Sequence, residues 1–409
     1  MFPIVKSPVM VTSFSERFKD LFSKPQFSHF ITYLTGLIIS ANKTVQGIND
    51  NFIDRKDQSA LNHFITDSNW DEQAVNEQRI ELINEHVKDV ADKDALLIID
   101  DTLSHKSGPK IEQVGIFYDH SSSEYVLAHQ VVASLLSAKD IRLPLDLRVY
   151  KKYKEGDTGF KTKIDLARDL IQAAYENKVR FSCVVFDSWY LAQKLITYIA
   201  SLKKYWISQL KSNRVIRMGT GKISVAEYVK AIPKDQFKKI KVKDHFFYVY
   251  SRTVTISKIG KVKLVVFYET EDFSDEVTVL GSSAHVWTPD KIIYSYKQRW
   301  SIENFYKDSK LNLGFEDYEL RKLKGIIRHW YLVYAAYTLL HLSTQDKNLT
   351  KWFNAQFKTI GERCRYATSE TIQHFVLWVI RMHHQLKDEE KVVSLIFNPK
   401  AKIRFTLSS

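Results

Sequence analysis

The chain has 409 residues, with 60 Lys and Arg against 47 Asp and Glu, so its net charge is +13. This length is sufficient for two or three domains with substantial cores, and the hydrophobic share of 44% is that of an ordinary globular protein. Two widely separated cysteines, Cys183 and Cys364, exclude a disulfide framework, and the longest apolar stretch, residues 330–342, is too short to span a bilayer and is predicted to be a core helix.

Residues 1–90 are predicted to be a helical N-terminal domain. Helices predicted over residues 43–51 and 58–66 flank a break at Asp54-Arg55-Lys56, which is the pattern of a helix-turn-helix. The second of these helices would then read DNA in the major groove. The first ninety residues hold nine Lys or Arg against twelve Asp or Glu. This acidic balance favours the alternative of a plain helical packing layer.

Two short apolar runs are each followed by aspartate. Residues 95–99 lead into Asp100-Asp101-Thr102, and residues 181–186 lead into Asp187. Runs of this length are typical of buried strands, and carboxylates at the ends of such strands converge where an α/β sheet keeps its sites. Asp is also common at helix N-caps and in turns, which is the structural alternative for each. Strand alternation sends Asp100 and Asp101 to opposite faces, so only one of them is expected in such a site.

Extended segments and a helix are predicted between these aspartates. Residues 112–118, 125–137 and 141–150 are predicted strands, and the first two are joined by a Ser-rich turn. Residues 161–177 carry apolar side chains at helical spacing, which predicts a helix that covers the sheet.

The positive excess of the chain lies in one segment. Between Lys203 and Lys263, sixteen Lys or Arg stand against three Asp or Glu, and this difference equals the whole net charge of +13. Such a block is the electrostatic footprint of a polyanion partner, and the alternative is a solvated lysine-rich surface. Strands are predicted over residues 205–210, 245–256 and 261–270. Residues 203–286 are therefore expected to form a basic, β-rich insertion.

A helix with an unusual stripe of side chains is predicted after this insertion. Thr288-Pro289-Asp290 supplies the signals of a helix start, and Gly314 supplies the stop. A helix advances about 100° per residue, so five side chains of this segment lie on or beside one stripe of the helix surface about 60° wide. They are one aromatic residue, three cations and one carboxylate. These residues are Tyr296, Arg299, Glu303, Lys307 and Lys310. Surface ion pairs do not require this arrangement, whereas a site that holds a metal and grips phosphates does.

This stretch resembles the signature Y-x2-R-x3-E-x6-K of DDE-type insertion-sequence transposases, the YREK group, at every spacing. The neighbouring Trp300, Ile302 and Phe305 are similar to the family's R-W-x-I-E-x-F pattern, and the order Asp, Asp, Glu extends the resemblance over most of residues 90–345. The resemblance implies an α/β protein with a ribonuclease H-like catalytic core interrupted by a β-rich insertion, and with helical N- and C-terminal regions.

The resemblance also implies a division into five parts. Residues 1–90 would be the helical N-terminal domain with the helix-turn-helix that binds element ends. Residues 91–202 and 287–345 would be the two parts of the ribonuclease H-like core, with the insertion at residues 203–286 between them. Residues 346–409 would be a C-terminal helical region, in which residues 349–357 and 370–386 are predicted helices.

In the resemblance, Asp101, Asp187 and Glu303 are the catalytic, metal-binding triad, and Asp101 is preferred to Asp100 because the family's first Asp directly precedes Thr. Carboxylates of this kind suit Mg²⁺, with Mn²⁺ as a substitute and two ions per site. DNA phosphates would be bound by Tyr296, Arg299, Lys307 and Lys310. Trp287 is a candidate for stacking on a displaced base, and packing is its alternative role.

The implied function is that of a transposase, an endonuclease that cuts at the ends of a mobile element and joins 3′-OH strands to target DNA. Its partners would be terminal inverted repeats, target DNA and a second copy of the chain, with no membrane. No nucleotide is expected, because the Gly219 to Ser224 stretch lacks Walker residues at Ile216 and Ile223. A cytoplasmic location at the nucleoid is expected. Two alternatives are a catalytically silent, transposase-derived DNA-binding protein and a metal-dependent nuclease without strand transfer.

Overall fold

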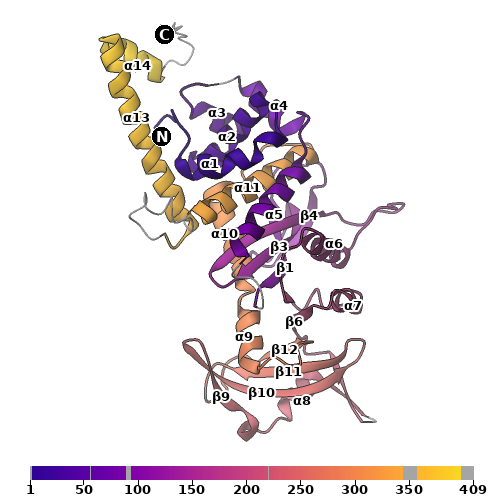
Figure 1. The fold of residues 1–409 in the computed structure, drawn as a ribbon. Helices are drawn as coiled ribbons and strands as arrows, with labels where there is room; N and C mark the ends of the chain where they lie inside the picture. The colour runs from indigo at the N-terminus through magenta and orange to yellow at the C-terminus, as the bar shows by residue number, and fades with distance from the viewer. Residues whose placement is uncertain (1, 56, 89–93, 220, 344–356, 398–409) are drawn as a thin grey trace. The chain divides into compact units, whose positions relative to one another are not determined.

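The computed structural model describes residues 2–55, 57–88, 94–219, 221–343 and 357–397 (Figure 1). These residues fall into two compact units. The helical unit comprises Met1–Leu82, Lys106–Gln113 and Lys307–Ser409, and the sheet unit comprises Ile83–His105 and Val114–Tyr306. Three predicted features lie outside the described residues: Lys56 in the N-terminal break, Thr220 in the stretch from Gly219 to Ser224, and the helix over residues 349–357 apart from Phe357.

The helical unit is built around one long apolar helix, α11 (Leu323–Ser343). Residues 330–342 of α11 are buried, which confirms the predicted core helix. It packs against α1 (Val9–Ser15), α2 (Lys24–Ile39) and α4 (Gln58–Thr66), and Figure 1 shows this group of helices. Further helices of this unit are η1 (Glu16–Leu21), α3 (Val45–Asp50), α13 (Ile360–Leu386) and α14 (Glu389–Phe397), and it also contains the first part of α5 (Glu72–Val87), as far as Leu82. No helix in the described ranges is long and apolar enough to cross a membrane.

The two helices of the expected helix-turn-helix are present as α3 and α4, and α4 has the predicted bounds. Residues 51–57 separate them, which is a longer link than the turn of about three or four residues in that motif. The predicted helix over residues 370–386 is confirmed as the larger part of α13. Binding of element ends by α4 stays a prediction.

The described part of the sheet unit contains a twelve-stranded mixed sheet in the order β2-β3-β1-β5-β6-β12-β11-β10-β7-β8, with β4 beside β3 and β9 beside β10. β1, β5 and β6 run parallel, and the other pairs are antiparallel. Together with the helical ends of the chain, this sheet confirms the expected mixed α/β class. The strands are β1 (Leu96–His105), β2 (Gly115–Asp119), β3 (Glu124–Ala138), β4 (Ile141–Tyr150), β5 (Cys183–Phe186), β6 (Tyr205–Gln209), β7 (Val215–Met218), β8 (Gly221–Ser224), β9 (Lys238–Val242), β10 (His245–Ile256), β11 (Gly260–Tyr268) and β12 (Thr278–Ser282).

The first strand is longer than predicted, since it was expected to end at Asp100-Asp101-Thr102. β1 continues through Asp100 and Asp101 as far as His105. The reason is the length of β3, which pairs with β1 along its whole course and places Asp100 opposite Ala133 and Asp101 opposite Val132. Both aspartates therefore lie inside a strand, where side chains alternate between the two faces of the sheet.

The β-rich segment extends the same sheet. β6 lies parallel to β5, and β12 then pairs with β6, so the later strands continue from the first aspartate strands without a gap. Helices α8 (Val225–Lys230) and η2 (Lys234–Gln236) belong to this segment. Two further helices, α6 (Lys163–Glu176) and α7 (Gln193–Ser201), precede it. The predicted amphipathic helix is confirmed as α6, which begins at a capping box formed by Thr162 and Asp165.

The prediction of one continuous helix from Pro289 to Leu313 is wrong. The structure has α9 (Pro289–Lys297) and α10 (Trp300–Leu313) with a turn between them. At this turn, the N–H of Arg299 bonds to the carbonyl of Tyr296 at 2.9 Å, and the N–H of Ile302 bonds to that of Arg299 at 3.1 Å. These three-residue spacings replace the four-residue spacing of an α-helix. Gly314, at a φ of +70°, follows the end of α10 as predicted.

Candidate active site

One guanidinium joins two of the acidic side chains that the sequence singled out. Arg299 lies in the turn between α9 and α10, and its Nη1 is 2.8 Å from Oδ2 of Asp100 on β1. Its Nη2 is 2.9 Å from Oε1 of Glu303, one turn further along α10. The side chains of Arg299 and Asp100 are 14% and 15% exposed, so this ion pair is screened little by solvent.

A third carboxylate, Asp187, lies next to this bridge. The parallel register pairs Ile99 of β1 with Phe186 of β5, so Asp100 and Asp187 are the next residues along two neighbouring strands. Burial raises the pKa of Asp100 to about 7, while Arg299 lowers it and the charges of Asp101 and Asp187 raise it. Asp100 is therefore a carboxylate that takes up a proton near neutral pH.

The same charges also shift the pKa of Arg299. Burial opposes its charge, but Asp100, Tyr296, Glu303 and Asp187 outweigh burial and raise its pKa. Its Nε is buried and has no hydrogen-bond partner among the described residues. The guanidinium is thus held by two carboxylates, which occupy two of its five N–H donors.

Asp101 points to the other face of the sheet, as strand alternation predicts. Its Oδ2 accepts hydrogen bonds from Nζ of Lys163 at 3.0 Å and Nε2 of Gln130 at 2.7 Å. Its Oδ1 accepts one from the buried hydroxyl of Tyr190 at 2.7 Å. Burial and the charge of Asp101 raise the pKa of Tyr190 well above its ordinary value, so this hydroxyl stays a donor. Asp101, which the resemblance assigns as the first metal ligand, is therefore hydrogen-bonded to α6 and to the residues that follow β5.

Asp187 caps the turn that follows β5. Its Oδ1 accepts hydrogen bonds from the backbone N–H groups of Trp189 at 2.9 Å and Tyr190 at 3.4 Å. These bonds are the capping contacts that were the structural alternative for this residue. They do not remove Asp187 from the neighbourhood of Asp100 and Arg299, whose pKa values both respond to its charge.

The acidic residues fit Mg²⁺ in kind, because all are hard oxygen donors. In arrangement they pair with cations instead: Asp100 and Glu303 with Arg299, and Asp101 with Lys163. Within the described ranges, no group of three or more His, Cys, Asp or Glu is placed to hold a metal ion.

Two of the residues predicted to contact DNA are buried in the protein. Tyr296 is 9% exposed, its hydroxyl donates to Oε1 of Gln209 at 3.3 Å, and burial raises its pKa. Trp287 is 8% exposed and meets the ring of Tyr205 edge-on at a centroid distance of 5.6 Å. Nζ of Lys291 lies 4.2 Å from the centre of the Trp287 ring. Stacking of Trp287 on a base would require that the ring leave this packing.

The remaining two predicted residues, Lys307 and Lys310, lie further along α10, in the part of the helix that belongs to the helical unit. Lys307 is exposed. Nζ of Lys310 forms an ion pair with Oε1 of Glu316 at 2.9 Å.

Sequence reasoning missed the residues that surround Asp101. Gln130, Lys163 and Tyr190 are 29, 62 and 89 positions away from it in sequence. Trp189 was missed as well: it is 46% exposed, and Nζ of Lys163 lies 4.6 Å from the centre of its ring. Their positions in the sequence were the only signals. Lys163 lies near the start of the predicted helix, and Trp189 and Tyr190 follow Asp187 closely.

Comparison with known proteins identifies the family of this chain. A family model described as DDE superfamily endonuclease matches residues 17–227, which include both predicted aspartates but not Glu303. The chain is 25% identical over 336 residues, 78% of this chain and 83% of the other, to a probable transposase for insertion sequence element IS701 of Microchaete diplosiphon. The NurA nuclease from Sulfolobus solfataricus is 10% identical, with a TM-score of 0.27 over 56% of this chain and 81% of that one, a likeness too small to bear on the fold. The matched residues 17–227 are more than half of the chain, and the protein therefore belongs to the DDE superfamily of endonucleases.

Proposed function

We propose that this chain is the transposase of an insertion sequence, which cleaves phosphodiester bonds at the ends of its element and transfers the freed 3′-OH strands into target DNA. The observation that carries the proposal is the meeting of Asp100, Glu303 and Arg299 beside Asp187, in a chain of the DDE endonuclease superfamily. The similarity to the probable transposase of element IS701 supports the same activity.

The proposed metal ligands are Asp187, Glu303 and one aspartate of β1. Mg²⁺ or Mn²⁺, as a pair of ions at these carboxylates, would activate the attacking oxygen and stabilise the leaving oxygen of an in-line displacement. The resemblance assigns Asp101 as the first ligand, because it directly precedes Thr102. The contacts of Arg299 support Asp100 in the same role, because Asp100 shares this guanidinium with Glu303. The two aspartates are therefore alternative first ligands.

Arg299 is the proposed clamp on the scissile phosphate. It lies at the carboxylate cluster, and each Nη carries a second N–H besides the one directed at a carboxylate, so this guanidinium can bind carboxylate and phosphate with different donors. Lys307, Lys310 and Tyr296 are proposed to bind phosphates along the DNA. For Tyr296 this requires that its hydroxyl exchange Gln209 for a phosphate oxygen.

We further propose that the first part of the sheet is a ribonuclease H-like core. The support is its order of elements: β1 to β4 are joined in antiparallel pairs, α6 follows, and β5 returns parallel to β1. On this proposal the strands from β6 to β12, within residues 203–286, are the insertion that interrupts the core, and the other four parts are residues 1–90, 91–202, 287–345 and 346–409.

Transposition requires that two element ends be cut together. We therefore propose that the chain acts as a homodimer on a pair of terminal inverted repeats and on target DNA, in the cytoplasm at the nucleoid. The basic block between Lys203 and Lys263 supports a DNA partner because its charge is not balanced by acidic neighbours in sequence.

One observation favours a second candidate function, that of a DNA-binding protein derived from a transposase that does not cut. The acidic residues form ion pairs with Arg299 and Lys163 instead of a metal cluster within the described ranges. A protein that kept this pairing on DNA would bind ends without cleaving them.

The test is an assay with purified protein, a plasmid that carries the two ends of the element, and Mg²⁺ or Mn²⁺. The proposed function predicts both cleaved ends and products joined to target DNA. Nicks without joined products would instead indicate a nuclease without strand transfer. Tight end binding without any cleavage in either metal would favour the silent DNA-binding protein.

A further inference from the structure

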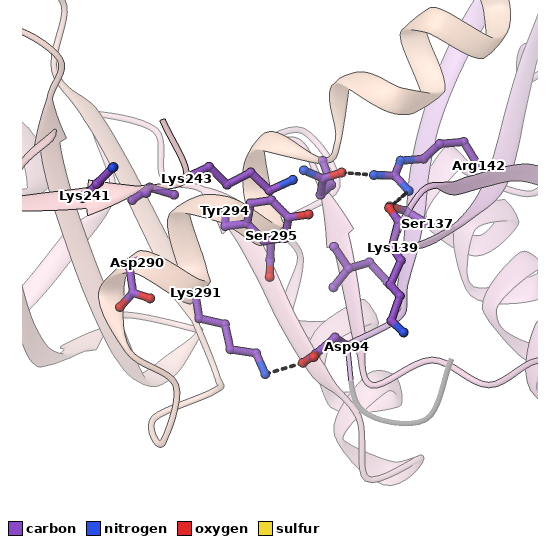
Figure 2. Close-up of a pocket in the computed structure, with 13 residues that line it drawn as sticks. Asp94, Ser137, Lys139, Arg142, Lys241, Lys243, Asp290, Lys291, Tyr294 and Ser295 are labelled. Atoms are coloured by element: carbon purple, nitrogen blue, oxygen red, sulfur yellow. Dashed lines mark hydrogen bonds and ion pairs between the residues drawn. The ribbon is translucent and has the colours of Figure 1, made fainter. Parts of the chain in front are cut away.

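The sheet unit contains a pocket of about 460 Å³ (Figure 2). None of the acidic residues of the candidate active site lines it. One wall comes from the start of β1 and the turn between β3 and β4, and the other from α9 and the end of β9. Asp100 lies four residues beyond Leu96, the β1 residue in the pocket wall, which is about 13 Å along a strand. The pocket is therefore a feature separate from the carboxylate cluster.

Cations dominate the lining of this pocket. It contains five Lys or Arg and two Asp: Lys139, Arg142, Lys241, Lys243, Lys291, Asp94 and Asp290. One of these cations is neutralised, since Nζ of Lys291 lies 2.6 Å from Oδ1 of Asp94. The guanidinium of Arg142 makes hydrogen bonds within the protein: its Nε donates to Oγ of Ser301 at 2.9 Å, and its Nη2 donates to Gln298. The pocket keeps a net charge of +3, because Lys139, Lys241, Lys243 and Arg142 remain positive and Asp290 remains negative.

Lys139, Lys241 and Lys243 form no ion pair with a carboxylate of the described residues. Lys139 and Lys243 occupy equivalent positions, each being the first residue of a two-residue hairpin loop followed by Asp, with φ values of +49° and +52°. Figure 2 shows both side chains at the pocket, together with the ring of Tyr294. Nζ of Lys243 lies 4.5 Å from the centre of that ring.

A net positive pocket attracts anions. Positive charge also continues from the pocket along β9, through Lys241 and Lys238, whereas Lys239 between them pairs with Glu271 at 3.7 Å. A row of cations that leads out of a pocket matches a chain of phosphates better than a single free anion, because phosphates repeat along a nucleic acid backbone.

We propose that this pocket binds two backbone phosphates of DNA, one through Lys139 and one through Lys243, outside the catalytic cluster. The proposal rests on the proposed function in one respect, that DNA is the polyanion. Lys139 comes from the core turn and Lys243 from the β-rich segment, so a strand seated here is held by both parts of the sheet unit. The contact positions DNA and carries no base specificity.

The test measures binding without cleavage, by fluorescence anisotropy of a labelled 30-base-pair duplex with EDTA at several salt concentrations. The variant is Lys139→Gln with Lys243→Gln. The matched control is Lys178→Gln with Lys387→Gln, two exposed lysines with positive φ values of +58° and +50° that lie outside the basic block and do not line the pocket. Both double variants lose the same charge, so only the loss of specific contacts distinguishes them.

The proposal predicts that the slope of log K against log salt becomes shallower by about 1.8 in the pocket variant, at about 0.9 per lost phosphate contact, and stays near the wild-type slope in the control. Equal slopes in the two variants overturn it. Thermal unfolding with inorganic phosphate separates the sources of the anion: a pocket-dependent shift with an unchanged DNA slope means a free phosphate site and also overturns it. If the double variant unfolds early, the two single variants must each change the slope by about 0.9.

Failure of this proposal and failure of the proposed function are distinguishable. A wild-type protein that cuts and joins DNA, with no pocket-dependent slope, overturns the pocket alone. A protein that never cuts, but whose salt slope depends on Lys139 and Lys243, upholds the pocket and overturns the transposase activity.

Discussion

Nη1 of Arg299 lies 2.8 Å from Oδ2 of Asp100, and this ion pair ties the turn between α9 and α10 to the middle of β1. The same guanidinium holds Glu303. A helix break, a buried aspartate and the predicted catalytic glutamate are therefore coupled through one side chain.

Replacing Arg299 by Gln is expected to lower the free energy of unfolding by about 2 kcal/mol. The loss comes from leaving Asp100 without its cation, and proton uptake by Asp100 keeps it below the cost for a fully buried pair. The measurement is urea unfolding at pH 7. Lys297→Gln is the control, because its ion pair with Glu269 is exposed and should contribute less than about 1 kcal/mol. Equal losses in both variants would show that the Arg299 bridge does not stabilise the fold.

Replacing Tyr190 by Phe tests whether Asp101 is the first metal ligand. The change removes one hydrogen bond, of 2.7 Å, to Oδ1 of Asp101 and keeps the ring. If Asp101 binds metal, loss of this orienting bond should slow DNA cleavage roughly 10- to 100-fold. The measurement is the initial rate of end cleavage in Mg²⁺.

Tyr306→Phe is the matched control for that change, because the Tyr306 hydroxyl donates to the backbone carbonyl of Asp100 at 3.1 Å. A slower rate with Tyr190→Phe alone supports Asp101. Wild-type rates with Tyr190→Phe, combined with a loss of cleavage in Asp100→Asn but not in Asp101→Asn, would move the first ligand to Asp100.

His329, in the core of the helical unit, should make a destabilising contribution in mild acid. Its Nε2 must donate to the carbonyl of Gly314 at 2.8 Å, so its Nδ1 accepts from the hydroxyl of Tyr33 at 2.9 Å, and burial lowers its pKa to about 3. The unfolded chain binds a proton below a pH of about 6.5 and the folded chain does not, so stability is lost as the pH falls.

The contribution of His329 is a loss of roughly 2 kcal/mol between pH 7 and pH 5, and proton uptake by Asp100 opposes it in the wild type, so urea unfolding compares wild type and variants at both pH values. Between these pH values His329→Gln should change in stability more favourably than wild type by that amount, whereas His384→Gln, on the exposed surface of α13, should follow wild type. A wild-type dependence that survives in His329→Gln would place its cause at another group.

Much of the fold could be predicted because its signals are local. The apolar run of residues 330–342 became a buried helix, and β10 has the predicted bounds because its residues alternate over one strand. The break between α9 and α10 has no local signal, since Gln298, Arg299 and Trp300 are ordinary helix residues. Donors 156 to 159 positions away, on the side chain of Arg142, hold Gln298 and Ser301 at this turn.

The residue types of the candidate site could also be predicted from local patterns, but their contacts could not. The types and order of Asp101, Asp187 and Glu303 could be read from strand and helix patterns, because each is defined by its immediate neighbours. Their pairing with cations could not be read, since Lys163 meets Asp101 only after α6 has packed on the sheet. The extension of β1 beyond Thr102 was missed for a similar reason, because it depends on the length of β3.

The most direct test of the account is cleavage of a labelled element end in Mg²⁺ by wild type, Glu303→Gln and Glu269→Gln. Glu303 is the proposed metal ligand, and Glu269 is an exposed glutamate that pairs with Lys297. The account predicts that Glu303→Gln loses at least about a thousandfold in rate, roughly 4 kcal/mol of barrier, while Glu269→Gln cuts like wild type. Cleavage by Glu303→Gln at the wild-type rate would contradict it.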